Sequence, residues 1–467
     1  MKYMSNNPHD QRRETWRFLV SVAAFAIVIL ASGCATVDPR PDYDRAGHLI
    51  EVSTGVADAH HPLEPGLANE ELESRLADGL ALQESVETAL LNNRRLQAAF
   101  LDIGIARADV VQSGLLSNPS LGITILIPFT SGATDIQAYL AQSIVDLWEM
   151  PIMKRAAGHE LESQILRVAR MAGTLVAETR RAYYDTVAAR ELLAIAEKNE
   201  ALLLKSYETI RIHREAGVAS SLDELLQLRE AQQAELAVRE ARLDAATSLR
   251  ELAALLSLDA DVDDLELTDP LPELSIPSFD AETLITFARD ERLDLRALSE
   301  AVLADDAQVE LEYARVFPEV SLGFGAEREA NSIGPTASIT LPIFDQNQAQ
   351  IAKAEYRRLQ TVRSHEDLYL GIAQDIRIAV DRASTRWGDV DLYRDKLLPQ
   401  SEANLEFTQA AYGTGTAGVI ALIASQRALL EAHRGYVVAW ADAASSLSDL
   451  ERAVGLPLDR IRAAGEQ

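Results

Sequence analysis

Few residues of this chain have the types and spacing needed for catalysis or metal binding. His60 and His61 are adjacent, but no cysteine or carboxylate cluster lies near them, and a metal site needs several ligands at set spacings. His159, His213 and His433 fall singly on predicted helices. No nucleophile elbow, phosphate-binding loop or zinc-helix signature is present. The sequence therefore predicts no enzyme, no cofactor and no metal site.

Cys34 is the residue whose setting predicts a covalent modification. Several arginines precede an apolar run at residues 18–31, which is shorter than the roughly 20 residues that span a bilayer. The run leads into Leu30-Ala31-Ser32-Gly33-Cys34, which resembles the bacterial lipobox, with Ala31 where that pattern usually has Leu. We expect residues 1–33 to be a signal peptide and Cys34 to carry lipid. The alternative is an ordinary cleaved signal with an incidental cysteine.

The charge and composition of the chain indicate which kinds of partner it can bind. The chain has 72 acidic and 44 basic residues and a net charge of −28, whereas nucleic-acid binding needs a basic face. Aromatic residues make up only 6% of the chain, and Ala and Leu are abundant beside Glu, Arg and Gln. This composition is typical of long, closely packed helices. We expect cations or basic surfaces as partners, and no nucleic acid.

The second half of the sequence repeats the first. Gly217 and Gly415 lie 198 residues apart in similar segments, and Pro119 and Pro318 lie 199 apart. Solenoid repeats have periods of roughly 20 to 50 residues, so this period is far too long for a solenoid. The sequence predicts an internal duplication, in which each unit buries its apolar surface against its twin or against other copies of the chain.

Each unit is predicted to open with an amphipathic helix, at residues 80–116 and 282–316, that stops at a proline. Apolar residues with a period of two then predict an outgoing strand and, after a polar link, a returning strand. The apolar positions of the first hairpin are Leu121, Ile123, Ile125, Ile127, Phe129, Ile136, Ala138 and Leu140. Those of the second are Val320, Leu322, Phe324, Ala337, Ile339, Leu341 and Ile343.

Very long helices are predicted to follow each hairpin. The first unit has a helix at residues 153–214 and a return helix at 222–256, and the second has one at 349–412, interrupted by Pro399, and a return at 419–454. The return helices carry leucine seams with coiled-coil spacing. Ser221 and Glu224 have the spacing of a capping box after the first turn.

The hairpins carry almost no charge, which leaves two interpretations. They could form a small soluble sheet packed on a helix, or they could lie in lipid, where only helices and closed barrels satisfy every backbone group. Four strands cannot close a transmembrane barrel, since the smallest have about eight. Strands in lipid would therefore need a barrel shared by two or three chains, and the sequence does not choose between these numbers.

The chain resembles the TolC-like outer-membrane factors, of the outer membrane efflux protein family, and within them the CzcC-like lipoproteins. The resemblance covers about residues 80–458 and rests on LALQESVETALLNNRRLQAA, SGLLSNPSLG, REAGVASSLDELLQLREAQ with its echo at Gly415, and ITLPIFDQNQAQIAKAE. It implies an α+β membrane protein: a homotrimer with a long antiparallel helical coiled-coil barrel in the periplasm and a transmembrane β-barrel with four strands per chain. It also implies a lipid anchor in the outer membrane, a periplasmic adaptor and an inner-membrane pump of the RND type.

On this basis the chain divides into a signal peptide at 1–33, a lipidated and extended strap at 34–78, and a C-terminal tail at 459–467. Repeat 1 spans 79–270, with its hairpin at 119–146 and its tip near 217. Repeat 2 spans 271–458, with its hairpin at 318–345 and its tip near 415.

The resemblance assigns two kinds of site. The turns between the long helices would form the rim that docks the adaptor, and their residues are Gly217, Val218, Ala219, Ser220, Gly415, Thr416, Ala417 and Gly418. Just beyond the tip, Asp223 with Glu224 would narrow a periplasmic gate, although Ala421 and Ala424 in repeat 2 carry no charge. Asp223 is equally expected in the first turn of a helix, where the helix dipole favours an acid.

The function implied is passive export of small solutes or metal ions through an efflux channel. A channel for type I protein secretion is the nearest alternative, because the same fold serves both. A periplasmic coiled-coil scaffold that conducts nothing is an alternative of a different class.

Overall fold

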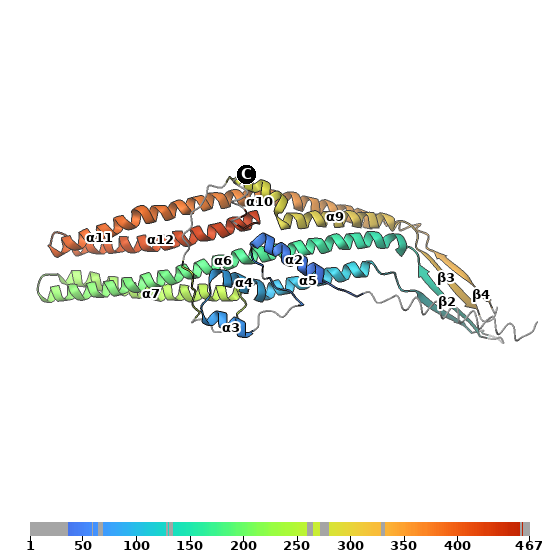
Figure 1. The fold of residues 1–467 in the computed structure, drawn as a ribbon, viewed down its shortest axis with the longest axis horizontal. Helices are drawn as coiled ribbons and strands as arrows, with labels where there is room; N and C mark the ends of the chain where they lie inside the picture. The colour runs from blue at the N-terminus through green and yellow to red at the C-terminus, as the bar shows by residue number, and fades with distance from the viewer. Residues whose placement is uncertain are drawn as a thin grey trace, which may run out of the picture.

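Long helices dominate the structure and run along its longest axis (Figure 1). The computed structural model describes residues 36–57, 59–63, 69–127, 129, 134–258, 265–270, 280–327, 332–457 and 460. The 70 residues of helix α6, Asp146–Glu215, would extend roughly 105 Å at about 1.5 Å per residue. This helix begins two turns before the predicted start, and Pro151 lies in its second turn, where the proline lacks the N–H that would bond the carbonyl four residues earlier.

The same order of elements occurs twice along the chain. The first set is α4 (Leu82–Asn92), α5 (Arg94–Ser113), β1 (Ser120–Leu126), β2 (Asp135–Ser143), α6 and α7 (Ser221–Leu255). The second is α8 (Ala281–Glu291), α9 (Leu293–Ala314), β3 (Val320–Glu327), β4 (Ser332–Ile339), α10 (Gln348–Leu392), the π-helix η1 (Tyr393–Leu397), α11 (Leu398–Gly413) and α12 (Val419–Val454). The chain is thus mostly helical with one small sheet, as the sequence predicted.

The opening helix of each unit is broken, although the sequence predicted it to be continuous. Asn93 and Arg292 have extended backbones between α4 and α5 and between α8 and α9. The Asn93 side chain caps α5 by accepting from the Leu96 N–H at 3.0 Å, and its amide donates to the Leu255 carbonyl at 2.8 Å. These contacts with the C-terminal end of a distant return helix stabilise the break.

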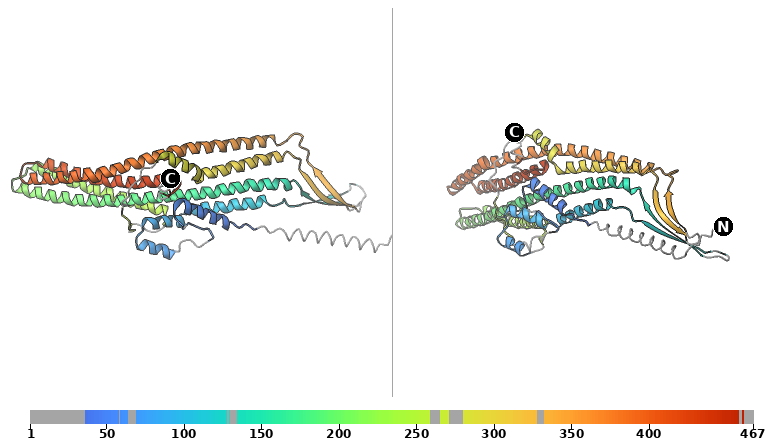
Figure 2. Two further views of the ribbon diagram at one scale, coloured as in Figure 1. Left: turned by 45° about the horizontal axis from the view of Figure 1, so that its top comes forward. Right: turned by 45° about the vertical axis from the view of Figure 1, so that its right-hand side comes forward.

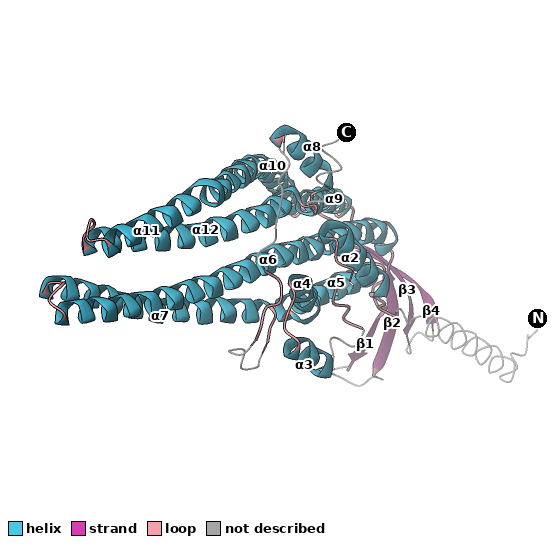
Figure 3. Ribbon diagram, turned by 60° about the vertical axis from the view of Figure 1, so that its left-hand side comes forward, coloured by secondary structure: helices cyan, strands magenta, loops and turns pink. Residues whose placement is uncertain are grey.

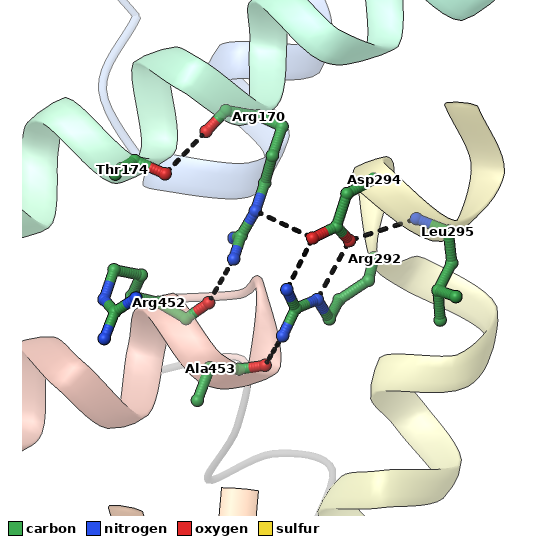
Figure 4. Close-up of polar contacts among 7 residues, drawn as sticks. All are labelled: Arg170, Thr174, Arg292, Asp294, Leu295, Arg452 and Ala453. Atoms are coloured by element: carbon green, nitrogen blue, oxygen red, sulfur yellow. Dashed lines mark hydrogen bonds and ion pairs between the residues drawn. The ribbon is translucent and has the colours of Figure 1, made fainter. Parts of the chain in front are cut away.

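The break at Arg292 is held by a buried polar cluster that joins the two units (Figure 4). The Arg292 guanidinium donates to the Ala453 carbonyl at 2.6 Å and to both oxygens of Asp294, at 3.0 and 2.5 Å. Arg170 of α6 donates to the Arg452 carbonyl at 2.9 Å and lies 3.4 Å from Asp294. Burial, followed by the nearby charge of Arg292, lowers the pKa of Arg170 to about 10. The end of α12 is thus capped from both units.

The sequence predicted that Pro399 interrupts the long helix of the second unit. In the structure the interruption is a short π-helix just before Pro399, and the helix does not end there. The five-residue π-helix η1 comes directly before α11, which carries Pro399 in its first turn. A π-turn widens the helix and accommodates the missing proline N–H, so the chain continues in one direction. Gly435 of α12 makes room there, since a Cβ at this position would lie 2.4 Å from the Tyr393 hydroxyl.

The prediction that residues 34–78 form an extended strap is wrong in part, because this segment contains helices α2 (Arg40–Thr54) and α3 (Asn69–Ala77). Pro41 lies in the first turn of α2, where a proline costs no hydrogen bond. Helix α2 packs beside α5 and α6 (Figure 2). Its buried Tyr43 fits against Gly104, where a Cβ would lie 2.7 Å from the hydroxyl, and Asp42 accepts from Arg107 at 2.5 Å. Cys34 and the signal peptide lie outside the described residues.

The sheet lies at one end of the molecule, beyond the helix ends rather than on a helix face (Figures 1 and 3). Its strand order is β1-β2-β3-β4, and all neighbours are antiparallel. The β2–β3 pair joins the hairpins of the two units. The main core lies midway along the molecule, where α2, α4, α5, α6, α7, α9 and α12 meet.

Candidate functional site: the helical tips and the sheet

The two turns between the long helices lie together at the end opposite the sheet (Figure 1). Gly217 and Gly415 have φ angles of +76° and +74°, a left-handed conformation that glycine adopts without strain. In both turns the next residue donates back to a carbonyl of the incoming helix: Val218 to His213 at 2.8 Å and Thr416 to Ala411 at 2.9 Å. The tips therefore have the same backbone structure, as the sequence predicted.

The cap that opens α7 is shifted by one residue from the prediction. The Ser220 hydroxyl accepts from the Asp223 N–H at 3.1 Å, and the Asp223 carboxylate accepts from the Ser220 N–H at 3.0 Å and from its hydroxyl at 2.8 Å. The predicted pair of Ser221 and Glu224 is wrong, because Ser221 already lies in the helix and Glu224 forms an ion pair with Arg214.

The two gate candidates of the prediction, Asp223 and Glu224, are therefore both engaged within their own hairpin. In the second unit Gly418 occupies the cap position and provides no side chain. Ala421 and Ala424 are exposed and neutral, as the sequence indicates. At the candidate gate positions, acidic side chains therefore come from the first unit only.

The two tips are held to one another by a contact that sequence analysis missed. Arg427 of α12 donates to both oxygens of Glu230 on α7, at 2.6 and 2.9 Å, and Arg229 donates to the same carboxylate at 3.0 Å. The Glu230 side chain is 5% exposed and that of Arg427 is 52% exposed. Burial raises the pKa of Glu230, but the hydrogen bonds from Arg427 and Arg229 outweigh it and leave the pKa below its ordinary value.

Apolar side chains reinforce this contact nearer the tips. Buried Ile210, Val419 and Ile423 pack together across the two units. Tyr412 packs against them, and its burial, together with the negative charge of Asp223, raises its pKa.

The two long hairpins are separated between their bases and their tips. A groove of about 660 Å³ lies between α6 and the α11–α12 hairpin, and apolar side chains such as Leu398, Leu405 and Leu429 line much of it. Because this groove separates the two hairpins, the contacts near the tips hold them together at the end of the molecule opposite the sheet.

The sheet has one apolar and one polar face. Residues opposed in an antiparallel pair lie on the same face, so the register defines both faces. The first face is apolar apart from Gln142, and consists of Leu121, Ile123, Ile125, Ile136, Ala138, Leu140, Gln142, Val320, Leu322, Phe324, Ala326, Ile333, Pro335, Ala337 and Ile339. The second face is polar or small apart from Leu126 and Tyr139, and it includes Thr124, Asp135, Gln137, Ser143, Ser321, Glu327, Thr336 and Ser338.

The sheet is incomplete within one chain. β1 and β4 each have a neighbour on one side only, so both edges present unpaired backbone groups. The apolar face is not covered: Ile123 is 63% and Phe324 is 65% exposed. An uncovered apolar face between two open edges needs a further partner.

The paired histidines belong to the packing of the strap. The His60 N–H donates to the Leu90 carbonyl at 3.2 Å, the His60 ring contacts the Phe100 ring edge to face, and His61 lies 3.6 Å from Asp44. In the described part of the chain, no three His, Cys, Asp or Glu side chains gather as a metal site would require. The same residues contain no helix that is both long and apolar enough to cross a membrane.

Comparison with known proteins finds a family to which part of the chain is similar. A family model described as outer membrane efflux protein matches residues 284–456, which run from α8 to just past α12. The matched stretch, which lies in the second unit, is similar to this family.

Individual relatives match most of the length of the chain. It is 25% identical to Protein CyaE of Bordetella pertussis, over 77% of this chain and 81% of that protein. It is 24% identical to the toluene efflux pump outer membrane protein TtgF of Pseudomonas putida, over 94% of this chain and 97% of that protein. The crystal structure of a membrane protein from Pseudomonas aeruginosa has the same fold, with a TM-score of 0.70 at 22% identity, over 80% of this chain and 93% of that one.

Proposed function

We propose that this chain is the outer-membrane channel of a tripartite efflux system, in which it passively conducts small solutes or metal ions from an adaptor and an RND-type pump to the exterior. The observation that carries the proposal is the sheet, with one apolar face, one polar face and two open edges. Three copies would provide twelve strands, enough for a barrel whose apolar face meets lipid and whose polar face lines the channel. Relatives whose names describe efflux pump outer membrane proteins support the same assignment.

The remaining parts of the proposal, namely the conduit, the lipid anchor, the docking tips and the gate, follow from the resemblance of the sequence to the TolC-like family. The repeats at 79–270 and 271–458 would line the helical conduit together, and lipid on Cys34 would anchor the strap, within the CzcC-like lipoprotein subgroup. The tips at Gly217–Ser220 and Gly415–Gly418 would dock the adaptor, and their matching exposed turns support this role. Asp223 would act at the gate only after leaving the cap in which Ser220 holds it.

Two alanines of β2 on opposite faces provide a matched test. Ala138 lies on the apolar face, opposite Ile123, and Ala141 lies on the polar face, opposite Ser120. A lysine facing lipid near the bilayer midplane costs about 2–4 kcal/mol, whereas lumen positions tolerate charge. We expect Ala138→Lys to reduce the yield of trimer in the outer membrane, and Ala141→Lys to assemble and to shift the ion selectivity of the channel toward anions.

The measurements are native mass spectrometry of the detergent-purified protein and conductance in planar bilayers. A trimer that conducts and that tolerates Ala141→Lys better than Ala138→Lys supports the proposal. A folded protein that conducts no ions would favour the scaffold. A water-soluble monomer with an intact sheet, or equal effects of both lysines, would refute the shared barrel.

A further inference from the structure

One row of the sheet consists of a tyrosine and three glycines. The row runs across all four strands on the polar face, and its members are Gly122, Tyr139, Gly325 and Gly334. The rows on either side carry small or polar side chains: Ser120, Ala141, Gly323 and Thr336 toward the helices, and Thr124, Gln137, Glu327 and Ser332 toward the hairpin links. Tyr139 is therefore much larger than its neighbours on this face, and it is 47% exposed.

The far end of the Tyr139 ring lies over Gly122 of the neighbouring strand. A Cβ at Gly122 would lie 2.1 Å from Cζ of the ring, 2.3 Å from Cε1 and 2.4 Å from the hydroxyl oxygen. The ring thus occupies the space that a side chain at position 122 would need, and it leans along the sheet instead of projecting away from it. Aromatic rings that cover glycines of edge strands in this way also stabilise the edge.

The other side of Tyr139 offers the ring no equal place. A Cβ at Gly325 would lie 3.1 Å from the methyl group of Thr336, so this methyl group already borders the glycine. A side chain at position 122 would meet only the end of a flexible side chain, whereas one at Gly323 would meet the backbone. A methyl group at position 122 would therefore displace the ring away from the sheet and leave the strands in place.

The position of this ring matters in the proposed barrel, where the polar face lines the channel. Three copies of the row would surround the lumen with glycines, interrupted by three tyrosine rings. Residues that face the lumen tune the selectivity of such barrels, and the diameter of a pore limits what passes. Rings that lie against the wall leave the row open, and rings that turn inward narrow it.

We propose that Tyr139 sets the width of the channel at this row, and with it the largest solute that leaves the cell. Gly122 keeps the channel wide because it lets the ring lie against the wall. The inference rests on the proposed function and adds to it a residue that determines the size of the substrate. This residue lies at the end of the molecule opposite the candidate gate at the helical tips (Figure 1).

Two cysteine reporters on β4 measure passage through the row. Ser332 and Ser338 are exposed on the polar face, Ser332 on the side of the hairpin links and Ser338 on the side of the helices. Maleimide–polyethylene glycols of graded mass, all too large for general porins, are added to cells that carry the full chain. From outside, the reagent must pass the row to reach Ser338→Cys but not to reach Ser332→Cys. The chain without an added cysteine is the blank, because Cys34 is its only cysteine.

The readout is the largest reagent mass that labels Ser338→Cys. We expect Gly122→Ala to lower this limit, Tyr139→Ala to raise it, and the double variant to match Tyr139→Ala. Gly334→Ala is the matched control, because its new Cβ in the same row has no atom within 4 Å. It should leave the limit unchanged, and labelling of Ser332→Cys should be the same in every variant. A purely structural role for Tyr139 would alter the yield of the protein and not the mass limit.

The two proposals fail in different ways. An unchanged limit in both Gly122→Ala and Tyr139→Ala, with Ser332→Cys labelled, would overturn the inference and leave the proposed channel standing. Tyr139→Ala only removes atoms, so it tests the inference even where Gly122→Ala assembles poorly. Absence of labelling at both cysteines, in a chain that reaches the outer membrane, would refute the channel and the inference with it.

Discussion

The buried ion pair between Glu230 and Arg427 predicts how firmly the two tips are held together. The substitution Glu230→Gln keeps the volume of the side chain and removes its charge. It removes the negative charge that accepts four hydrogen bonds, at 2.6, 2.6, 2.9 and 3.0 Å, and leaves two guanidinium groups facing a neutral amide.

The size of the effect follows from the burial of the two partners. Breaking a fully buried pair costs about 3–5 kcal/mol. Arg427 is 52% exposed and regains water when its partner is lost, so the cost is lower, at about 2 kcal/mol. Glu235→Gln is the matched control on the same helix, because its pair with Arg239 is exposed on both sides and is worth at most about 0.5 kcal/mol.

The assay is amide hydrogen exchange of the intact protein, followed at residues 419–430 of α12. Because 1.4 kcal/mol corresponds to a factor of ten, a loss of about 2 kcal/mol predicts roughly 30-fold faster local exchange in Glu230→Gln and little change in Glu235→Gln. Equal exchange in the two variants, or faster exchange confined to α7, would show that this ion pair does not hold the tips together.

The remaining predictions concern pH, the tips, the sheet and the gate. The pKa of Glu230 is lowered in the folded protein, so its ion pair stabilises the contact between the tips fully at any pH above the ordinary glutamate pKa. Amide hydrogen exchange at the tips, corrected for intrinsic rates, should therefore be unchanged from pH 7 to 5 and should become faster only in stronger acid. Gly217→Val should lower the free energy of unfolding by at least about 1–2 kcal/mol, because valine is strained at the positive φ of this residue, and should lower the melting temperature. Gly371→Ala, in a helix with open space around the new Cβ, should not lower the melting temperature. Gly323→Val should disrupt the β2–β3 pair and lower the yield of the proposed trimer, because its Cβ would lie 2.0 Å from the Leu140 carbonyl, whereas Gly334→Val has open space; equal trimer yields would contradict this. Asp223→Asn should reduce cation selectivity in planar bilayers, and unchanged selectivity would remove this carboxylate from the gate.

The features that could be predicted from sequence are those with a local cause. Alternating apolar residues identified all four strands, and long segments without proline identified the helices on both sides of each tip. The glycines at 217 and 415 marked the turns because only a positive φ continues the chain there. Each of these signals lies within a few residues of the structure that it produces.

The features that were missed depend on distant partners. The break at Asn93 depends on the Leu255 carbonyl, and the one at Arg292 on the Ala453 carbonyl. Glu230 and Arg427 are 197 residues apart, and a lone charged residue on a helix carries no sign of such a partner. The capping box was wrong by one residue because Ser220 and Ser221 are adjacent serines, each with an acid three positions later.

The two breaks perform the same task with different chemistry. Each places a polar side chain against a carbonyl at the end of the return helix, which would otherwise lack a donor. The neutral amide of Asn93 needs nothing more. The buried guanidinium of Arg292 needs a counter-charge, which Asp294 provides, and Asp294 in turn lies 3.4 Å from Arg170 of the other unit. The charge at one break thus joins the two units at the middle of the molecule. The hairpins are fixed at this junction and are held again near their tips by the Glu230–Arg427 ion pair and the apolar cluster of Ile210, Val419 and Ile423.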